Sequence, residues 1–156
     1  PMVRLADLPP DERQHLMAKS MEPLRPPVFV ATRTPLAQRR VALITTAGLH
    51  FRDAPSFDLM DPSYRVIPGD LRGDELVMSH SSVNFDRSGF QEDLNVVFPI
   101  DRFRELVDEG IVGSLANQHV SFMVSLVLPS MIEASARQVA GLLRQDRVDT
   151  VFLTPV

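Results

Sequence analysis

The stretch VALITTAG, residues 41–48, decides the fold class of this chain. It is a continuous apolar run ended by a glycine, which is typical of a strand buried on both faces of a parallel sheet. SYRVIPGD (63–70), HVSFMVSLVL (119–128) and VDTVFLTPV (148–156) predict further strands. ELVMSH (75–80) predicts an extended piece or a short helix, because its periodicity does not decide between them.

Helices are expected between these strands. Asp101 is predicted to cap a helix that includes Phe103 and ends at Gly110, and residues 129–147 carry apolar side chains at helical spacing. Strands that alternate with helices indicate βαβ crossovers. We therefore expect an α/β fold with three layers and a mostly parallel sheet, similar to the flavodoxin and Rossmann folds and incomplete at its C-terminus.

Proline divides the chain into two parts. Residues 1–37 contain seven prolines, and proline fixes φ and lacks a backbone N–H, so this region excludes a long helix or a central strand. One short helix fits between Pro10 and Ser20. We expect a Pro-rich N-terminal arm (1–37) with that one helix, followed by an α/β domain (38–156).

The composition excludes several classes of function. The 156 residues carry a net charge of −4, which argues against nucleic acid and anionic membranes as partners. There is no cysteine, and hence no disulfide or thiol nucleophile within these residues. No stretch reaches the length of about 18 apolar residues that a membrane span needs, and no signal peptide is evident, so we expect a cytoplasmic protein. The glycine spacing of nucleotide-binding loops is absent.

The strand predicted at residues 148–156 is apolar at Val151, Phe152 and Leu153, whereas edge strands more often carry charge. It is either the last strand of the sheet or a strand that turns at Pro155 toward a covering helix. A residue at such a turn would lie where α/β proteins bind ligands. A thiol or selenol there would have a lowered pKa, because the positive end of the helix dipole stabilises its anion.

Six segments together resemble the selenoprotein B family of the D-proline and glycine/sarcosine/betaine reductases, over residues 27–156. DLNVVFPIDR, at the start of the fourth segment, is the most specific of the matches. After Met123 the sequence departs from the family, which commonly has a glycine where Val124 stands here. The segments are VALITTAGLH (41–50), SYRVIPGD (63–70), VMSHSS (77–82), DLNVVFPIDRFRELVDEGIVG (93–113), NQHVSFM (117–123) and VDTVFLTPV (148–156).

The resemblance implies an oxidoreductase that reductively cleaves a C–N bond of an amino acid or amine. In this family the last segment is followed at once by selenocysteine or cysteine. Because selenocysteine is encoded by a stop codon, we expect a chain truncated after Val156 and inactive as it stands, with no cofactor of its own. The resemblance also implies a partner reductase subunit, which holds the substrate through a pyruvoyl group, and an oligomeric assembly.

Two histidines are candidate catalytic residues. His80 matches the Ser-His motif of the family in VMSHSS, and His50 follows a strand that ends in glycine. Either imidazole has the chemistry to move a proton to a leaving amine. The alternative is that each one hydrogen-bonds the loop backbone. His119 precedes a buried strand and is expected to be a core or edge histidine.

Four residues are candidates for substrate binding. Arg65 and Arg102 carry the guanidinium fork that clamps a carboxylate, although a structural ion pair is the alternative for both. Ser81 lies in the Ser-His motif. Asp93 ends the polar stretch SHSSVNFDRSGFQED (79–93), which is predicted to be a long loop, and it either binds substrate or pins the loop together with Asn95.

Two other function classes remain open at the level of sequence. The first is a non-catalytic α/β binding or assembly domain that pairs its open sheet edge with another chain. The second is a metal-dependent hydrolase with His50, His80 and Asp86 as ligands.

Overall fold

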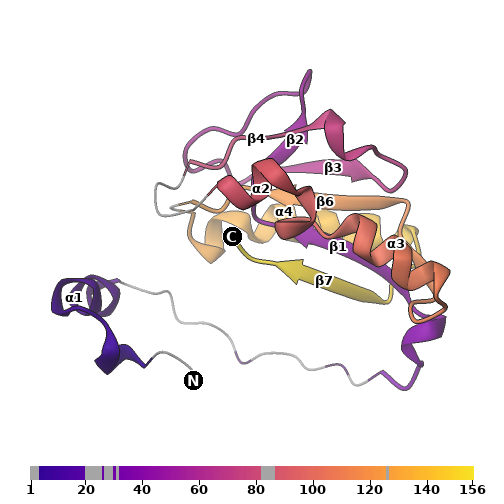
Figure 1. Cartoon of the computed structure of the whole chain (residues 1–156), viewed down its shortest axis with the longest axis horizontal. Coiled ribbons are helices and arrows are strands. Elements are labelled where there is room, and N and C mark those ends of the chain that lie inside the picture. The colour runs from indigo at the N-terminus through magenta and orange to yellow at the C-terminus, as the bar shows by residue number, and fades with distance from the viewer. Residues whose placement is uncertain (1–3, 20–25, 27–29, 31, 82–86, 126) are drawn as a thin grey trace. The chain divides into compact units, whose positions relative to one another are not determined.

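The computed structural model describes the whole chain except residues 1–3, 20–25, 27–29, 31, 82–86 and 126. The chain forms two compact units, Pro1–Ala31 and Thr32–Val156. The first unit contains a short 3₁₀ helix, Leu5–Asp7, and helix α1, Pro10–Ala18 (Figure 1). Helix α1 begins on a proline, whose fixed φ suits a first helical position, so the predicted short helix is confirmed.

The second unit is built on a five-stranded sheet whose central strand is β1, Arg40–Thr45 (Figure 1). Strand β7, Thr150–Thr154, runs parallel to β1 over five residue pairs. Two short strands, β5 (Ser114–Leu115) and β6 (Gln118–Phe122), pair in parallel with the start and the end of β1, respectively. Strand β3, Tyr64–Pro68, is antiparallel to β6. The predicted α/β fold with a mostly parallel sheet is therefore confirmed.

A second, two-stranded sheet lies beside the first. Strands β2 (Leu49–Phe51) and β4 (Leu76–Met78) pair antiparallel, so ELVMSH forms a strand rather than a helix. The remaining short helices connect these elements. They are the 3₁₀ helices Leu36–Gln38, Gly73–Glu75 and Leu94–Val96 and helix α2, Ser88–Glu92.

Two longer helices cover opposite faces of the sheet. Leu43 of β1 belongs to an apolar cluster with Ile100, the first residue of α3 (Ile100–Asp108). Its neighbour Ala42 belongs to a second cluster, with Val139 and Leu143 of α4 (Pro129–Gln145). Because alternate residues of a strand point to opposite faces, α3 and α4 lie on opposite sides of β1. The three layers expected from the sequence are present.

The predicted cap of α3 is wrong. The helix begins at Ile100, and the side-chain oxygen of Asn95 accepts hydrogen bonds from the backbone N–H groups of Asp101 and Arg102, at 3.0 and 3.4 Å. Asp101 instead accepts a 2.7 Å hydrogen bond from Arg104. A residue from the preceding 3₁₀ turn reaches the free N–H groups of the helix, and the local sequence pattern around Asp101 does not encode that path. Gly110 ends the helix at φ +71°, as predicted.

Two predicted strands are shorter than expected. The run 119–128 leaves the sheet after Phe122, and its last residues lead into α4 at Pro129. The strand predicted at 148–156 pairs only over Thr150–Thr154. Within the described residues, no helix is both long enough and apolar enough to cross a membrane.

His119 closes a break in the central ladder. Between β5 and β6 the backbone leaves β1, and the N–H of Leu43 donates to Nδ1 of His119 at 3.0 Å. Because Nδ1 accepts, the ring proton is on Nε2, which has no hydrogen-bond partner among the described residues. The ring is fully buried and contacts Phe98 edge-on, with centroids 5.8 Å apart. The prediction of a core histidine is confirmed.

Asp146, directly after α4, links Arg40 at the start of β1 to Asn117, which lies between β5 and β6. Its carboxylate accepts hydrogen bonds from the backbone and side-chain amides of Asn117, at 2.5 and 2.8 Å, and an ion pair from Arg40 at 2.8 Å. Partial burial alone would raise the pKa of Asp146, but the hydrogen bonds from Arg40 and Asn117 outweigh it and lower the pKa.

We predict that acid destabilises the fold through His119. Burial lowers its pKa from 6.5 to about 4, so the unfolded chain takes up the proton first as the pH falls. Stability is therefore fully present above pH 6.5 and is lost toward pH 4, where the loss from this one group reaches about 3 kcal/mol. Urea unfolding across this pH range measures it. His119→Asn, which keeps an acceptor for Leu43 but does not titrate, should lose this part of the pH dependence. Equal pH profiles for the two proteins would contradict the prediction.

Candidate functional site

The carboxyl end of β1 is where the strand order changes direction. From β1 the chain passes to β6 on one side, and from β6 it passes through α4 to β7 on the other side. In open α/β sheets, ligands bind in the crevice at such a switch point. The chain segments that leave the three strands here contain Thr46–Gly48, Met123 and Val156.

Thr46 joins the end of β7 to the end of β1. Its backbone N–H donates to the carbonyl of Thr154 at 3.2 Å, and its hydroxyl accepts from the N–H of Val156 at 2.9 Å. The side chain of Val156 packs against the apolar cluster that contains Ala47 and Leu49. The chain beyond β7 is thus held beside the carboxyl end of β1.

Gly48 brings the Ser-His motif to the same place. Its φ is +66°, and a side chain on it would come within 3.1 Å of Met123 and 3.2 Å of the backbone nitrogen of His80. Its carbonyl accepts the N–H of Ser79 at 2.9 Å. Ser81 donates its hydroxyl to the sulfur of Met123 at 3.4 Å. Only glycine allows both the turn and this close approach.

His80 is buried at this site. Burial lowers its pKa, and the nearby charge of Arg87 lowers it further, so the ring is neutral at pH 7. The guanidinium of Arg87 donates to the backbone carbonyl of His80, which fixes the main chain of the motif. A neutral imidazole accepts a proton and can pass it on.

His50 forms a pair with a residue that the sequence reasoning missed. One ring nitrogen, Nδ1, lies 2.7 Å from the carbonyl oxygen of Phe51, and the other, Nε2, lies 2.6 Å from the hydroxyl of Ser79. A carbonyl only accepts, so Nδ1 carries the proton and Nε2 accepts from Ser79. The signal that points to Ser79 is its position directly before His80 in VMSHSS.

Arg65 contacts His50 indirectly, through the ring of Phe57. Its guanidinium lies 4.2 Å from the centre of the Phe57 ring, and that ring contacts His50 edge-on. The guanidinium also donates to the carbonyls of Pro55 and Ser56 and pairs with Asp61 at 3.3 Å. The structural ion pair considered for Arg65 is therefore present.

The structure places Arg102 and Asp93 together at the start of α3, not among the contacts of the histidines. Arg102 pairs with Glu105 at 2.9 Å, on an exposed surface. The carboxylate of Asp93 accepts from the backbone and side chain of Asn95, both at 2.8 Å, and these bonds lower its pKa. The side-chain-to-backbone bond considered for Asp93 and Asn95 is present, and it caps the 3₁₀ helix Leu94–Val96.

The metal-site hypothesis gains no support. Asp86 lies outside the described residues, and elsewhere in the described chain no group of three or more acidic or histidine side chains could hold an ion. Both ring nitrogens of His50 already have partners.

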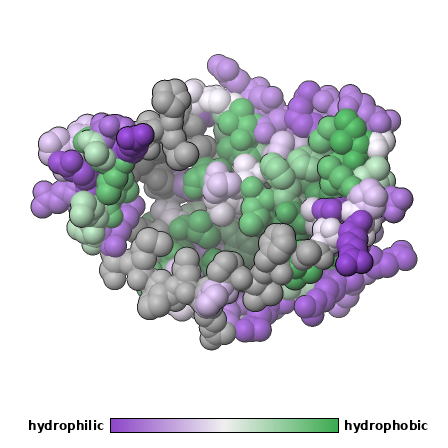
Figure 2. All heavy atoms as spheres, turned by 90° about the horizontal axis from the view of Figure 1, so that it is seen from below, coloured by the Kyte–Doolittle hydropathy of each residue, from purple (hydrophilic) through white to green (hydrophobic). Residues whose placement is uncertain are grey.

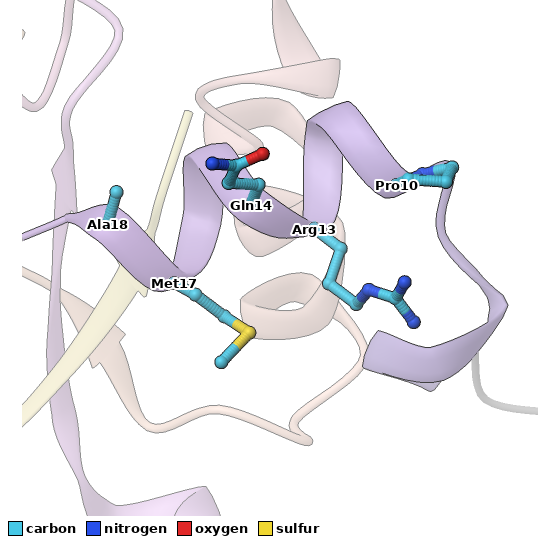
Figure 3. Close-up of a pocket in the computed structure, with 5 residues that line it drawn as sticks. All are labelled: Pro10, Arg13, Gln14, Met17 and Ala18. Atoms are coloured by element: carbon cyan, nitrogen blue, oxygen red, sulfur yellow. The ribbon is translucent and has the colours of Figure 1, made fainter.

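The N-terminal unit carries a shallow hollow on α1, which is shown in Figure 3. Its five labelled side chains all come from that one helix, and no candidate catalytic or substrate-binding residue is among them. They are Pro10, Arg13, Gln14, Met17 and Ala18.

These features define the second unit as a doubly wound α/β domain in which His50, shortly after the central strand, is hydrogen-bonded to Ser79. Residues 30–156 match the glycine/sarcosine/betaine reductase selenoprotein B family, and the chain belongs to that family. The family resemblance noted in the sequence is thereby confirmed.

Two curated relatives are similar to this chain in sequence. D-proline reductase subunit gamma from Acetoanaerobium sticklandii is 35% identical over 131 residues, which is 83% of this chain and 53% of the relative. Sarcosine reductase complex component B subunit beta from Peptoclostridium acidaminophilum is 27% identical over 125 residues, which is 76% of this chain and 28% of the relative. The chain thus spans about half of the first relative and about a quarter of the second. No solved structure matches the chain significantly.

We predict that Ser79→Ala destabilises the domain by about 1–3 kcal/mol, because it leaves Nε2 of a buried histidine without a donor. Urea unfolding measures the loss, and ¹⁵N spectra of the His50 ring should report the proton on Nδ1 in the unsubstituted protein. Ser56→Ala, at an exposed loop position, is the matched control and should leave stability unchanged. A proton found on Nε2 would contradict the assigned hydrogen bonds.

Proposed function

We propose that this chain is part of a reductase component that cleaves a C–N bond of an amino acid or amine, with His80 moving the proton at the carboxyl end of β1. Family membership supports the reductase class. The observation that carries the role of His80 is that one segment, Thr46–Gly48, contacts both Val156, two residues after β7, and the backbone of the Ser-His motif.

The nucleophile of this proposal is a selenocysteine or cysteine directly after Val156. Thr46 holds the backbone of Val156, so a residue there would begin its path beside the switch point. His80 takes the proton of the thiol or selenol, and the resulting anion attacks the carbon next to the substrate nitrogen. The electron pair of the C–N bond goes to that nitrogen, which takes the proton from His80.

A second thiol completes the reduction. It attacks the sulfur or selenium, forms a bond to it, and gives its proton to the released carbon. An external dithiol then reduces the new disulfide or selenenyl sulfide. We propose that the substrate is held by a partner subunit, in line with the relatives, which are named as parts of reductase complexes.

His50 and Ser79 are proposed as the supporting pair of this site. Ser79 is bonded to His50 through its hydroxyl and to Gly48 through its backbone. It therefore fixes where its neighbour His80 lies. Arg65 holds His50 through Phe57 in this proposal, and Ser81 lies beside Met123.

We predict that His80→Ala lowers kcat for C–N reduction by about 10²- to 10⁴-fold, the usual contribution of a proton-transferring side chain. The assay uses the protein purified with its companion subunits, a dithiol, and D-proline, sarcosine, glycine or betaine as substrate. His15→Ala, on the exposed surface of α1, is the matched control and should keep full activity.

Two results would contradict the proposal. The first is that none of the four substrates is reduced by the assembled protein. The second is that His80→Ala and His15→Ala have the same activity while both proteins remain folded.

A further inference from the structure

Strand β7 carries three large apolar side chains that the described chain leaves exposed. The exposed fractions of Val151, Phe152 and Leu153 are 41%, 41% and 66%. One edge of β7 is bonded to β1 along its whole length, and no described strand pairs with the other edge. The strand TVFLT has no charged residue. Edge strands are normally protected by charge, proline or a bulge, because an open apolar edge invites another strand.

Apolar side chains of β7 are partly exposed on both faces of the strand. Val151 and Leu153 lie opposite Ala42 and Ile44, on the side of the sheet that α4 covers. Phe152 lies on the side of α3 and contacts Phe103 with ring centroids 4.9 Å apart, yet it too remains partly exposed. Figure 2, which views the molecule from below as it stands in Figure 1, shows apolar side chains gathered across this part of the surface.

An occupant of this surface must therefore cover an edge and two faces. A second copy that paired its own β7 with this edge would bring no helix over either strand, and the uncovered apolar surface would become wider. A segment that contains a parallel strand covers the edge, and its crossover helix covers a face. A strand with its crossover helix would extend the sheet beyond β7 and keep helices on its faces.

D-proline reductase subunit gamma, the first relative, contains enough additional residues to form a strand and covering helices. The match covers 53% of D-proline reductase subunit gamma, so just under half of that chain has no counterpart in these 156 residues. We propose that β7 is the docking strand for a polypeptide segment equivalent to that unmatched part. Its strand pairs in parallel with the free edge of β7, and its helices cover Leu153 on one face and Phe152 on the other. This inference does not depend on the redox chemistry proposed above.

We predict that a photo-crosslinking phenylalanine derivative in place of Leu153 captures this segment. The protein is produced in its own cells, irradiated and digested, and the crosslinked peptide is sequenced by mass spectrometry. The peptide should align with the unmatched part of the relative, whether it comes from the same polypeptide or a companion one. The same derivative at Leu59, which is 61% exposed in a turn between β2 and β3, is the matched control and should give no such peptide.

Three outcomes would overturn the inference. They are a crosslinked peptide from within residues 1–156, which would indicate a second copy, a peptide with no similarity to the relative, and no crosslink at all. C–N reduction measured on the same preparation separates the two proposals. A correct crosslink without turnover would contradict only the proposed function, and turnover without the crosslink would contradict only the docking of β7.

Leu153→Glu tests the same surface by charge. With the photo-crosslinking derivative placed at Val151 instead, it should reduce recovery of the crosslinked peptide at least tenfold, while Leu59→Glu leaves that recovery unchanged. Both side chains are mostly exposed, so the 156-residue chain should unfold at the same urea concentration with either substitution. Recovery that Leu153→Glu does not lower would overturn the inference.

Discussion

The pairing of β1 on both of its edges is the constraint on which the rest of the structure depends. On one edge, β7 follows β1 residue by residue, and on the other edge, the ladder is shared by two short strands with a break between them. A buried backbone N–H without a partner is costly, and the ring of His119 supplies the missing acceptor. The buried imidazole lets β1 remain central while its partner strand bends away.

The candidate site follows from that arrangement. Because β6 and β7 both run parallel to β1, the segments after these three strands emerge at the same end of the sheet. Gly48 lets the Ser-His motif approach this end, and Thr46 hydrogen-bonds Val156, two residues after β7, there. The chain belongs to a family whose matching relatives are named as a D-proline reductase subunit and a sarcosine reductase complex component.

Much of the fold could be predicted because burial leaves a periodic pattern in the sequence. The run 41–48 and the apolar positions of 129–147 identify a central strand and a covering helix without any long-range information. Helix caps and the hydrogen-bond partners of polar side chains were harder to predict from the sequence. Asn95, not Asp101, caps α3, and the guanidinium of Arg65 serves a loop and an aromatic ring. Several side chains had the right chemistry for each role, and only the path of the loops selected among them.

The sequence by itself determined the buried strand at 41–48 and its closing glycine, the amphipathic helix at 129–147, and the family to which the residue motifs point. The tertiary structure decided which groups meet. It placed the proton of His50 on Nδ1 by setting a carbonyl against it, and it turned Ser79 into the partner of that ring. Among the described residues, it also left apolar side chains of β7 partly exposed on both faces of the strand. Hydrophobic periodicity is a local property of the chain, whereas a hydrogen bond between distant residues requires that the whole backbone first be in place.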